Sequence, residues 1–182
     1  MRARNRLGHA AHMQIRRAQT SEADALSLVA QKAKAYWGYP ASWLEQWREL
    51  LTITPEFIAQ NETWLAGEDR RSLGFYALRW HGTELRLEHL WVLPNEMKRG
   101  VGRKLFQHAA ARATALGANC LTIESDPHAE PFYLRLGAIR SGRVASEMEG
   151  ERREIPLLTF PLTNGGQKHF GEPTGERDGL AG

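Results

Sequence analysis

The chain has 182 residues, of which 42% are hydrophobic and 25% are charged, and these proportions are typical of a globular domain. Its length suits one domain and is short for two domains with a cleft between them. No run of about 18 apolar residues is present, so we expect no membrane-spanning helix. The net charge of +3 equals the contribution of Arg2, Arg4 and Arg6, and the remaining charges are mixed in sign. The composition therefore argues against a nucleic-acid-binding protein.

The chain contains one cysteine, Cys120, within the apolar segment 120–123. A single cysteine cannot form an internal disulfide, so nothing favours an oxidising compartment and we expect a cytoplasmic protein. Cys120 has no activating neighbour in the sequence, and a small hydrophobic residue of a strand is the favoured interpretation. The histidines lack the paired spacing of metal ligands, so we expect no metal site.

The first elements are a strand and a helix. Residues 1–12 are expected to form a flexible extension to a domain over 13–162, with Met13 as a candidate true start and the beginning of the first strand. Thr20 or Ser21 can cap a helix, because apolar residues then recur at spacings of three to four. These residues are Leu26, Val29, Ala33 and Trp37.

Two short helical segments and three strands follow. The helices are predicted at 42–51 and at Thr54-Pro55-Glu56, where proline occupies the first helical position. The strands are predicted at 63–66, 73–80 and 84–93. The turn His81-Gly82 joins the last two of them into a hairpin.

The pattern changes to a helical period after Pro94, because apolar residues mark one face of a helix that stops at Gly117. These residues are Val101, Leu105, Ala109, Ala113 and Leu116. A strand is predicted at 119–124. A strand, a helix and a strand in this order predict a parallel βαβ unit.

The last predicted elements are a helix at 127–136 and strands at 139–144 and 155–160. The tail over 163–182 is rich in glycine and charged residues and is expected to be disordered. Together the elements predict a single α/β domain. Its mixed, partly antiparallel central sheet would have about six to seven strands flanked by helices.

A glycine-containing loop enters the helix after Pro94 and places Gly100 and Gly102 at the helix start. Glycine lets a backbone approach an anion closely, and unpaired N–H groups at a helix N-terminus attract phosphate. The loop is not a Walker motif, and it lacks the third glycine of a dinucleotide fingerprint. A tight turn would explain it as well as a phosphate site. Four cationic side chains stand nearby, namely Lys98, Arg99, Arg103 and Lys104.

A second motif reads Asp-Pro-His-Ala-Glu-Pro-Phe-Tyr-Leu-Arg-Leu-Gly over residues 126–137. With the strand segment 87–94 and the glycine loop, in this order and at these distances, it resembles the GNAT superfamily of acetyl-CoA-dependent N-acetyltransferases. The usual patterns of the family are Gln/Arg-x-x-Gly-x-Gly/Ala and Asn-x-x-Ala-x-x-Phe-Tyr-x-x-x-Gly-Phe. The chain departs from these patterns at Met97, Asp126 and Ala138.

The resemblance implies acetyl-CoA as co-substrate, with its pantetheine arm between the fourth and fifth strands where these splay apart. Backbone groups of the fourth strand and of the glycine loop would hold it. Met97 removes one side-chain contact to the pyrophosphate, which Lys98 or Arg99 would replace. The implied cofactor-binding residues are Leu90, Trp91, Val92, Lys98, Arg99, Gly100, Val101, Gly102, Arg103, Lys104, Asp126, Ala129 and Phe132.

Acetyl transfer to an amine needs a neutral nucleophile, stabilisation of an oxyanion and a proton for the departing thiolate. By the family resemblance, Tyr133 is the candidate general acid, and a backbone N–H near Val92 is the candidate oxyanion donor. Neighbours on a strand face opposite sides of the sheet unless a bulge intervenes, so we expect at most one of Glu88 and His89 to point into the site. Glu88 is the first choice of base, directly or through water. A packing role stays open for all three side chains. Asp126 is expected to cap the next helix rather than to act in catalysis.

The acceptor amine is expected to approach along the aromatic segment 36–43, where the family has a variable region. Trp37, Tyr39 and Trp43 are candidate substrate-binding residues, because an aromatic wall suits a ligand with an apolar or cationic part. Core packing is the alternative for Trp43 and Trp47.

The leading functional hypothesis is direct transfer of acetyl from acetyl-CoA to a primary amine of a small molecule or peptide, in a ternary complex without an acyl-enzyme. Its main alternative is a non-catalytic acyl-CoA-binding or regulatory module. Neither a nucleic acid nor a membrane is expected as a partner, and a homodimer is an open option.

Overall fold

The computed structural model describes residues 12–68 and 71–162. Almost all of the predicted extension and the whole predicted tail therefore lie outside the described residues. In the described ranges no helix is long and apolar enough to cross a membrane.

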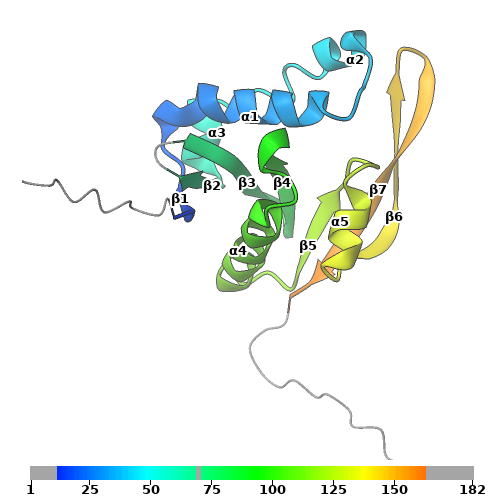
Figure 1. Cartoon of the computed structure of the whole chain (residues 1–182). Helices are drawn as coiled ribbons and strands as arrows, with labels where there is room; N and C mark the ends of the chain where they lie inside the picture. Colours follow the sequence, from blue (N-terminus) through cyan, green and yellow to red (C-terminus); the bar gives the residue numbers. More distant parts are fainter. Residues whose placement is uncertain (1–11, 69–70, 163–182) are drawn as a thin grey trace, which may run out of the picture.

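The centre of the fold is a seven-stranded mixed sheet in the order β1-β2-β3-β4-β5-β7-β6 (Figure 1). β4 and β5 run parallel, and the other neighbouring strands run antiparallel. The predicted α/β class and the parallel βαβ unit are thus confirmed. The strands are β1 (Gln14–Arg17), β2 (Glu62–Glu68), β3 (Arg71–His81), β4 (Glu84–Val92), β5 (Cys120–Glu124), β6 (Ile139–Met148) and β7 (Glu151–Pro161).

Helices cover both faces of this sheet. They are η1 (Thr20–Glu22), α1 (Ala23–Ala35), α2 (Ala41–Gln46), α3 (Pro55–Gln60), η2 (Pro94–Glu96), α4 (Val101–Ala115) and α5 (Glu130–Arg135). One buried cluster joins α4 and α5 to Tyr76 of β3, and the other joins α1 and α3 to the neighbouring Phe75. Because successive residues of a strand point to opposite faces, the two clusters lie on opposite sides of the sheet.

Local sequence explains where several helices begin. The Thr54 hydroxyl accepts a hydrogen bond from the Phe57 amide at 3.1 Å, and Pro55 occupies the first position of α3. Thr54 thus caps the helix, which begins at the proline as predicted. α5 starts at Glu130, later than predicted, because the Asp126 carboxylate first accepts the His128 amide at 2.9 Å in a turn.

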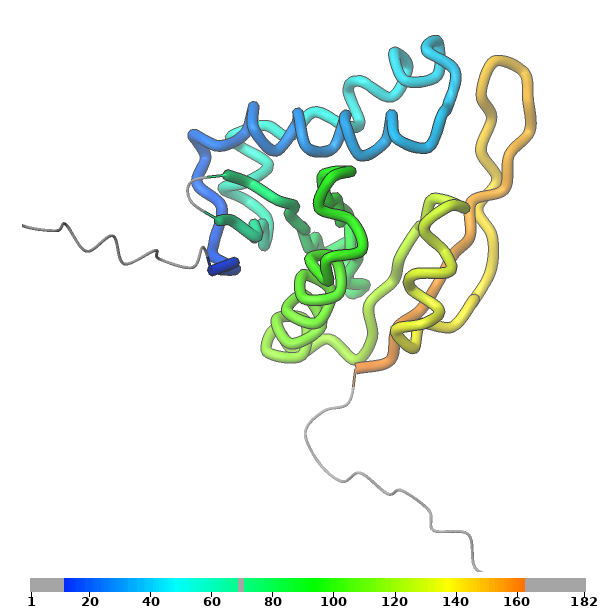
Figure 2. The backbone as a smooth tube through the Cα atoms, in the orientation of Figure 1, coloured from blue at the N-terminus to red at the C-terminus, as the bar shows by residue number. Residues whose placement is uncertain are grey.

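The predicted helix over 42–51 is also shorter in the structure, where α2 ends at Gln46 and turns follow it. β6 and β7 are longer than predicted because they pair with each other far beyond β5. Their hairpin extends to α2 (Figure 2), where Trp43 Nε1 and Gln46 Nε2 donate hydrogen bonds to the Glu149 carboxylate at 3.0 and 3.1 Å. The hairpin turn thus joins the last strands to the aromatic segment.

β4 contains a bulge at Glu88. Successive residues of β3 pair with Leu87 and His89, so that Glu88 is an extra residue in β4. Before the bulge, Leu87 packs in the cluster beneath α4, and after it Leu90 packs against that cluster while Trp91 packs against the α1 cluster. One inserted residue therefore reverses which alternate side chains face each side of the sheet.

β4 and β5 separate soon after they meet. They share one registered pair, Arg86 with Thr122, and β4 then continues to Val92 with no further pairing to β5. β5 is held along its whole length by β7 on its other side. The divergence leaves backbone N–H and C=O groups of β4 without a strand partner on that edge, as expected for a ligand site between the strands.

Gly74 lies where the backbones of β3 and β4 and the helix α4 approach closely. A methyl group at Gly74 would lie 2.6 Å from the Trp91 carbonyl oxygen and 3.1 Å from Leu105. We expect Gly74→Ala to lower the free energy of unfolding by about 2 kcal/mol, because the backbone must shift to admit the methyl group. Urea unfolding at neutral pH measures this loss.

Gly142→Ala is the matched control for this prediction. It also lies in a strand, but its added methyl group would be 3.7 Å from Leu157, an ordinary contact distance. We expect its stability to stay within about 0.5 kcal/mol of wild type. Equal losses in the two variants would show that alanine weakens either strand irrespective of space.

Candidate cofactor and acceptor site

A pocket of about 700 Å³ lies where β4 and β5 diverge. Its walls come from the end of α1, the second half of β4, the glycine loop, the end of β5 and the start of α5. The fold thus gathers segments that are far apart in the sequence around one cavity. The lining includes Ala33, Tyr36, Trp37, Glu88, Leu90, Trp91, Val92, Lys98, Gly100, Gly102, Arg103, Glu124, Asp126, His128, Ala129, Phe132, Tyr133 and Arg135.

The glycine loop presents backbone amides to this pocket. Gly100 has a φ of 82°, a left-handed conformation that glycine adopts without strain, and α4 begins at the next residue. The Lys104 amide donates to the Gly100 carbonyl at 3.0 Å and closes the first turn of the helix. The amides of Val101, Gly102 and Arg103 precede this bond, so they have no carbonyl partner within the helix. Such a helix start attracts an anion.

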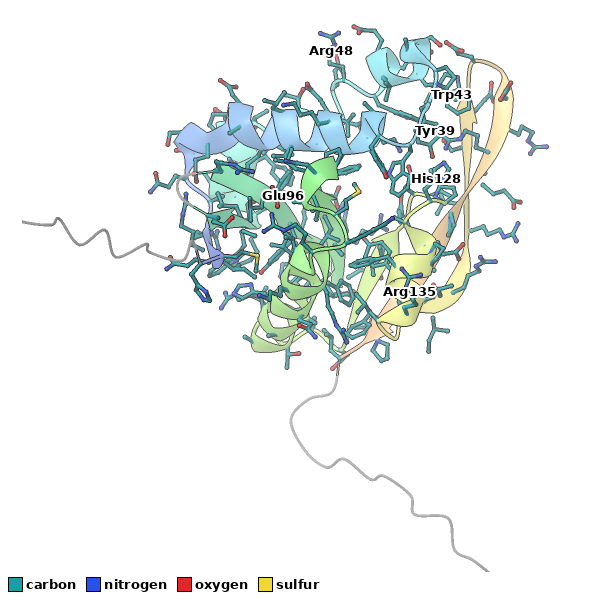
Figure 3. The ribbon with its side chains drawn as sticks, in the orientation of Figure 1. Tyr39, Trp43, Arg48, Glu96, His128 and Arg135 are labelled. Atoms are coloured by element: carbon teal, nitrogen blue, oxygen red, sulfur yellow. The ribbon has the colours of Figure 1, made fainter. Side chains whose placement is uncertain are left out.

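A buried carboxylate anchors the same loop. Glu96 is 2% exposed, and its carboxylate binds Arg71 of β3 at 2.8 Å and also pairs with Arg99. The Glu96 side chain (Figure 3) therefore ties the loop to the beginning of β3. Because Arg99 is held by Glu96, it is not among the pocket-lining residues. Lys98 remains the candidate to bind the pyrophosphate in place of the glutamine or arginine that the family has at position 97.

Charges line the pocket in two groups. Lys98, Arg103 and Arg135 are cationic lining residues, and Lys98 has the unusual φ of 63° that turns the loop. The lining carboxylates each bind a basic side chain outside the lining set. Glu88 binds His81 at 2.9 Å, Glu124 binds Arg86 at 2.9 Å, and Asp126 binds Lys34 at 2.5 Å.

Tyr133 lies in the pocket wall and is 6% exposed. Its ring packs at 5.0 Å from Phe132 and at 5.7 Å from Phe106, measured between centroids. Burial raises the pKa of the Tyr133 hydroxyl above its ordinary value, and the negative charge of Asp126 raises it further. The hydroxyl therefore keeps its proton at neutral pH and can act as a donor.

The bulge in β4 separates the two candidate bases. Glu88 lines the pocket, whereas His89 turns to the opposite face and packs against Phe57 and Phe75. His89 Nδ1 accepts a hydrogen bond from Trp91 Nε1 at 3.1 Å. Burial lowers the pKa of His89 to about 4, so that the ring is neutral at physiological pH. The arrangement leaves Glu88 as the candidate base.

Asp126 connects two walls of the pocket. Its carboxylate accepts hydrogen bonds from Lys34 of α1 at 2.5 Å and from the Tyr39 hydroxyl at 3.0 Å. Burial raises the pKa of Asp126, but Lys34, the His128 amide and Tyr39 outweigh that effect, and the pKa lies below its ordinary value. Burial lowers the pKa of Lys34, and the bond to Asp126 offsets this only in part. Asp126 thus has a wider structural role than the predicted helix cap.

The aromatic segment divides into two parts. Trp37 lines the pocket and stacks on His128 with ring planes 4° apart and centroids at 5.0 Å. Tyr39 and Trp43 lie beside the hairpin of β6 and β7 (Figure 3), and neither is a lining residue. The Arg153 guanidinium covers their rings at 5.4 and 4.8 Å. The protein's own cation therefore occupies aromatic faces that the sequence assigned to a ligand.

The structure brings most of the predicted site residues to one pocket and leaves six outside its lining. Those outside are His89, Arg99, Val101, Lys104, Tyr39 and Trp43. Sequence reasoning missed Lys34, His128 and Arg153, and it did not connect His81 to Glu88. A lysine on a helix or an arginine near the end of a hairpin normally indicates a solvent-facing position, so no local pattern distinguished these residues. Among residues 12–68 and 71–162, no group of three or more potential ligands is arranged to hold a metal ion.

Comparisons with known proteins agree with this geometry. A model of the acetyltransferase (GNAT) domain matches residues 30–153, and the chain therefore belongs to the GNAT acetyltransferase family. It is similar to the peptidyl-lysine N-acetyltransferase YiaC of Escherichia coli K12, with 31% identity over 100 residues. That match covers 54% of this chain and 65% of the relative.

Solved structures share the fold at lower identity. A GCN5-related N-acetyltransferase from Rhodopseudomonas palustris matches with a TM-score of 0.66 and 19% identity, over 82% of this chain and 95% of the other. The PaiA N-acetyltransferase from Thermoplasma acidophilum, in complex with coenzyme A, matches with a TM-score of 0.65 and 18% identity, over 82% and 99%. These likenesses establish the seven-stranded architecture as that of the family.

His89 gives a prediction for stability against pH. Its pKa is about 4 in the folded chain, against 6.5 for an unperturbed histidine. Between these values the unfolded chain binds a proton that the folded chain does not, so stability falls as the pH decreases from 6.5 towards 4. The difference corresponds to a loss on the order of 3 kcal/mol.

We expect His89→Gln to remove this part of the acid sensitivity while retaining an acceptor for Trp91. Urea unfolding of wild type and variant at several pH values from 7 to 4 measures the effect. The two stability curves should converge on acidification, and parallel curves would contradict the assignment of a buried neutral His89.

Proposed function

We propose that the chain transfers an acetyl group from acetyl-CoA to a primary amine of a small molecule or peptide, by direct attack within a ternary complex. The observation that carries the proposal is the meeting of three features at one pocket. These are the glycine loop at the start of α4, the divergence of β4 from β5, and the buried hydroxyl of Tyr133. The name of the Escherichia coli relative favours a peptide lysine as the acceptor.

In the proposed complex, the pyrophosphate of acetyl-CoA contacts the amides of Gly100 to Arg103, with Lys98 and Arg103 supplying positive charge. The pantetheine arm lies between β4 and β5 and bonds to backbone groups of Leu90 to Val92, which lack a partner strand there. Shape and backbone polarity carry this interaction. For this reason the methionine at position 97, where the family has glutamine or arginine, weakens acetyl-CoA binding without abolishing it.

The proposed reaction needs three proton transfers. Glu88 takes a proton from the acceptor ammonium, directly or through water, and the neutral amine attacks the thioester carbonyl carbon. A backbone N–H near Val92 stabilises the resulting oxyanion. The carbon–sulfur bond then breaks, the departing thiolate takes the Tyr133 proton, and the newly acylated nitrogen gives up its remaining extra proton to the Tyr133 phenolate. The products are an acetylated amine, free coenzyme A and a protonated Glu88 that returns its proton to solvent.

Acetyl-CoA binding is tested by thermal unfolding. At 1 mM acetyl-CoA and an affinity of about 10 μM, the folded chain gains roughly 2.7 kcal/mol, which raises the melting temperature by about 5 to 10 °C. Gly100→Ala should reduce this shift, because an L-residue resists the φ of 82° and the loop amides move. An unchanged shift would contradict the role of the loop.

Gly117→Ala is the matched control, because Gly117 has the same φ of 82° at the other end of α4 and is not a lining residue. Both variants introduce a similar strain of about 1 kcal/mol. Only Gly100→Ala should change the acetyl-CoA shift. Equal changes would assign the effect to general destabilisation.

Turnover tests the role of Tyr133. We expect Tyr133→Phe to reduce the rate of free-thiol release with an amine acceptor by roughly 100-fold, while the acetyl-CoA shift in melting temperature remains. Tyr76→Phe is the control, since Tyr76 is also a buried tyrosine but bonds to His108 at 2.7 Å away from the pocket. Acetyl-CoA binding without turnover on any amine would favour the non-catalytic alternative.

A further inference from the structure

Glu88 owes its place in the pocket to the bulge in β4. As the extra residue between Leu87 and His89, it has no paired position on β3. Its side chain is 28% exposed, and its neighbours Leu87 and Leu90 are also lining residues. A carboxylate at an unpaired position of a strand has more conformational freedom than one in a regular ladder. Its direction must therefore be set by another contact.

His81 supplies that contact. It is the last residue of β3, and its Nε2 lies 2.9 Å from Glu88 Oε2. The His81 side chain is 34% exposed, and it is not a lining residue of the pocket. The pair thus runs from the pocket wall at Glu88 to the solvent at His81.

Other charged groups surround the pair. Glu84, opposite His81 in the hairpin, interacts electrostatically with it, and Arg86 is within electrostatic range of Glu88. Arg86 is held by Glu84 at 3.2 Å and by Glu124 at 2.9 Å. His89 is neutral on the opposite face. Within the described ranges, the hydrogen bond to the Glu88 carboxylate comes from His81.

We propose that His81 is a positioning residue for the base Glu88, a role that rests on the proposed acetyl transfer. The His81 imidazole donates its Nε2 hydrogen to Glu88 Oε2, which directs the second carboxylate oxygen into the pocket. A donor on one oxygen also stabilises the ionised form of the carboxylate. Glu88 thereby directs an oxygen towards the acceptor ammonium, and the exposed His81 lies on the path by which the ammonium proton returns to water.

The test is the pH dependence of kcat/KM for an active amine acceptor, measured with the full chain from about pH 5.5 to 9. His81→Leu removes the donor, so the acid limb of the profile moves to higher pH. Activity falls roughly 10-fold at the acid end of this range and recovers towards the wild-type value at high pH. His81→Gln keeps an N–H donor and should retain the wild-type profile more closely. His108→Gln is the control, because His108 bonds to Tyr76 outside the pocket.

The outcomes separate this proposal from the proposed function. An unchanged pH profile in His81→Leu overturns the positioning role and leaves acetyl transfer intact. The same holds if both His81→Leu and His81→Gln lose the same activity at every pH. Wild-type protein that binds acetyl-CoA but releases no thiol with any amine overturns both. A shifted acid limb in His81→Leu, with an unaltered acetyl-CoA melting shift and partial rescue in His81→Gln, supports the proposal.

Discussion

The divergence of β4 from β5 is the constraint on which the site depends. After the single pair of Arg86 with Thr122, β4 follows β3, while β5 follows β7. Two half-sheets are thereby joined at one point and open beyond it. The opening exposes backbone polar groups, and it lets helix starts from both sides reach the same cavity. A regular ladder between these strands would close the pocket and satisfy the groups that a pantetheine arm can use.

Contacts across the opening keep the two halves in place. Lys34 and Tyr39 approach from the α1 side and share the carboxylate of Asp126 on the other side, and Trp37 stacks on His128 beside them. Removing one partner of a partly buried ion pair lowers the free energy of unfolding by more than the intact pair adds to it, because the remaining charge is left buried without a partner. The contacts therefore hold α1 against the start of α5 at this end of the pocket more than they add to stability.

Much of the fold follows from local patterns. The apolar spacing from Val101 to Leu116 identifies α4, and the threonine and proline at 54–55 identify α3. The motif over 126–137 leads to the pocket, although it does not reveal that Asp126 binds a lysine of α1. The sequence places the start of α5 too early because Pro127 resembles a first helical residue, whereas Asp126 and His128 form a turn first.

The remaining features depend on tertiary contacts that a sequence pattern does not encode. Nothing in Glu88 or His89 marks an extra residue, because the bulge is defined by the partner strand. Lys34 pairs with Asp126, and His81 pairs with Glu88. The spacing of these partners along the chain matches no helix or strand period, so no sequence pattern indicates the pairs. Tyr39 and Trp43 resemble ligand-binding residues in the sequence because the covering Arg153 arrives from β7, far along the chain.

The bulge at Glu88 also makes the number of residues in β4 as important as their identity. Leu87 and Leu90 are three positions apart and face the same cluster only because Glu88 is an extra residue between them. Deleting one residue here would restore a regular ladder in which Leu90 still faces α4, but the pocket would lose Glu88, or Glu88 would take the place of His89 on the opposite face. Insertions and deletions should thus be far less tolerated in β4 than in the turn at 149–150.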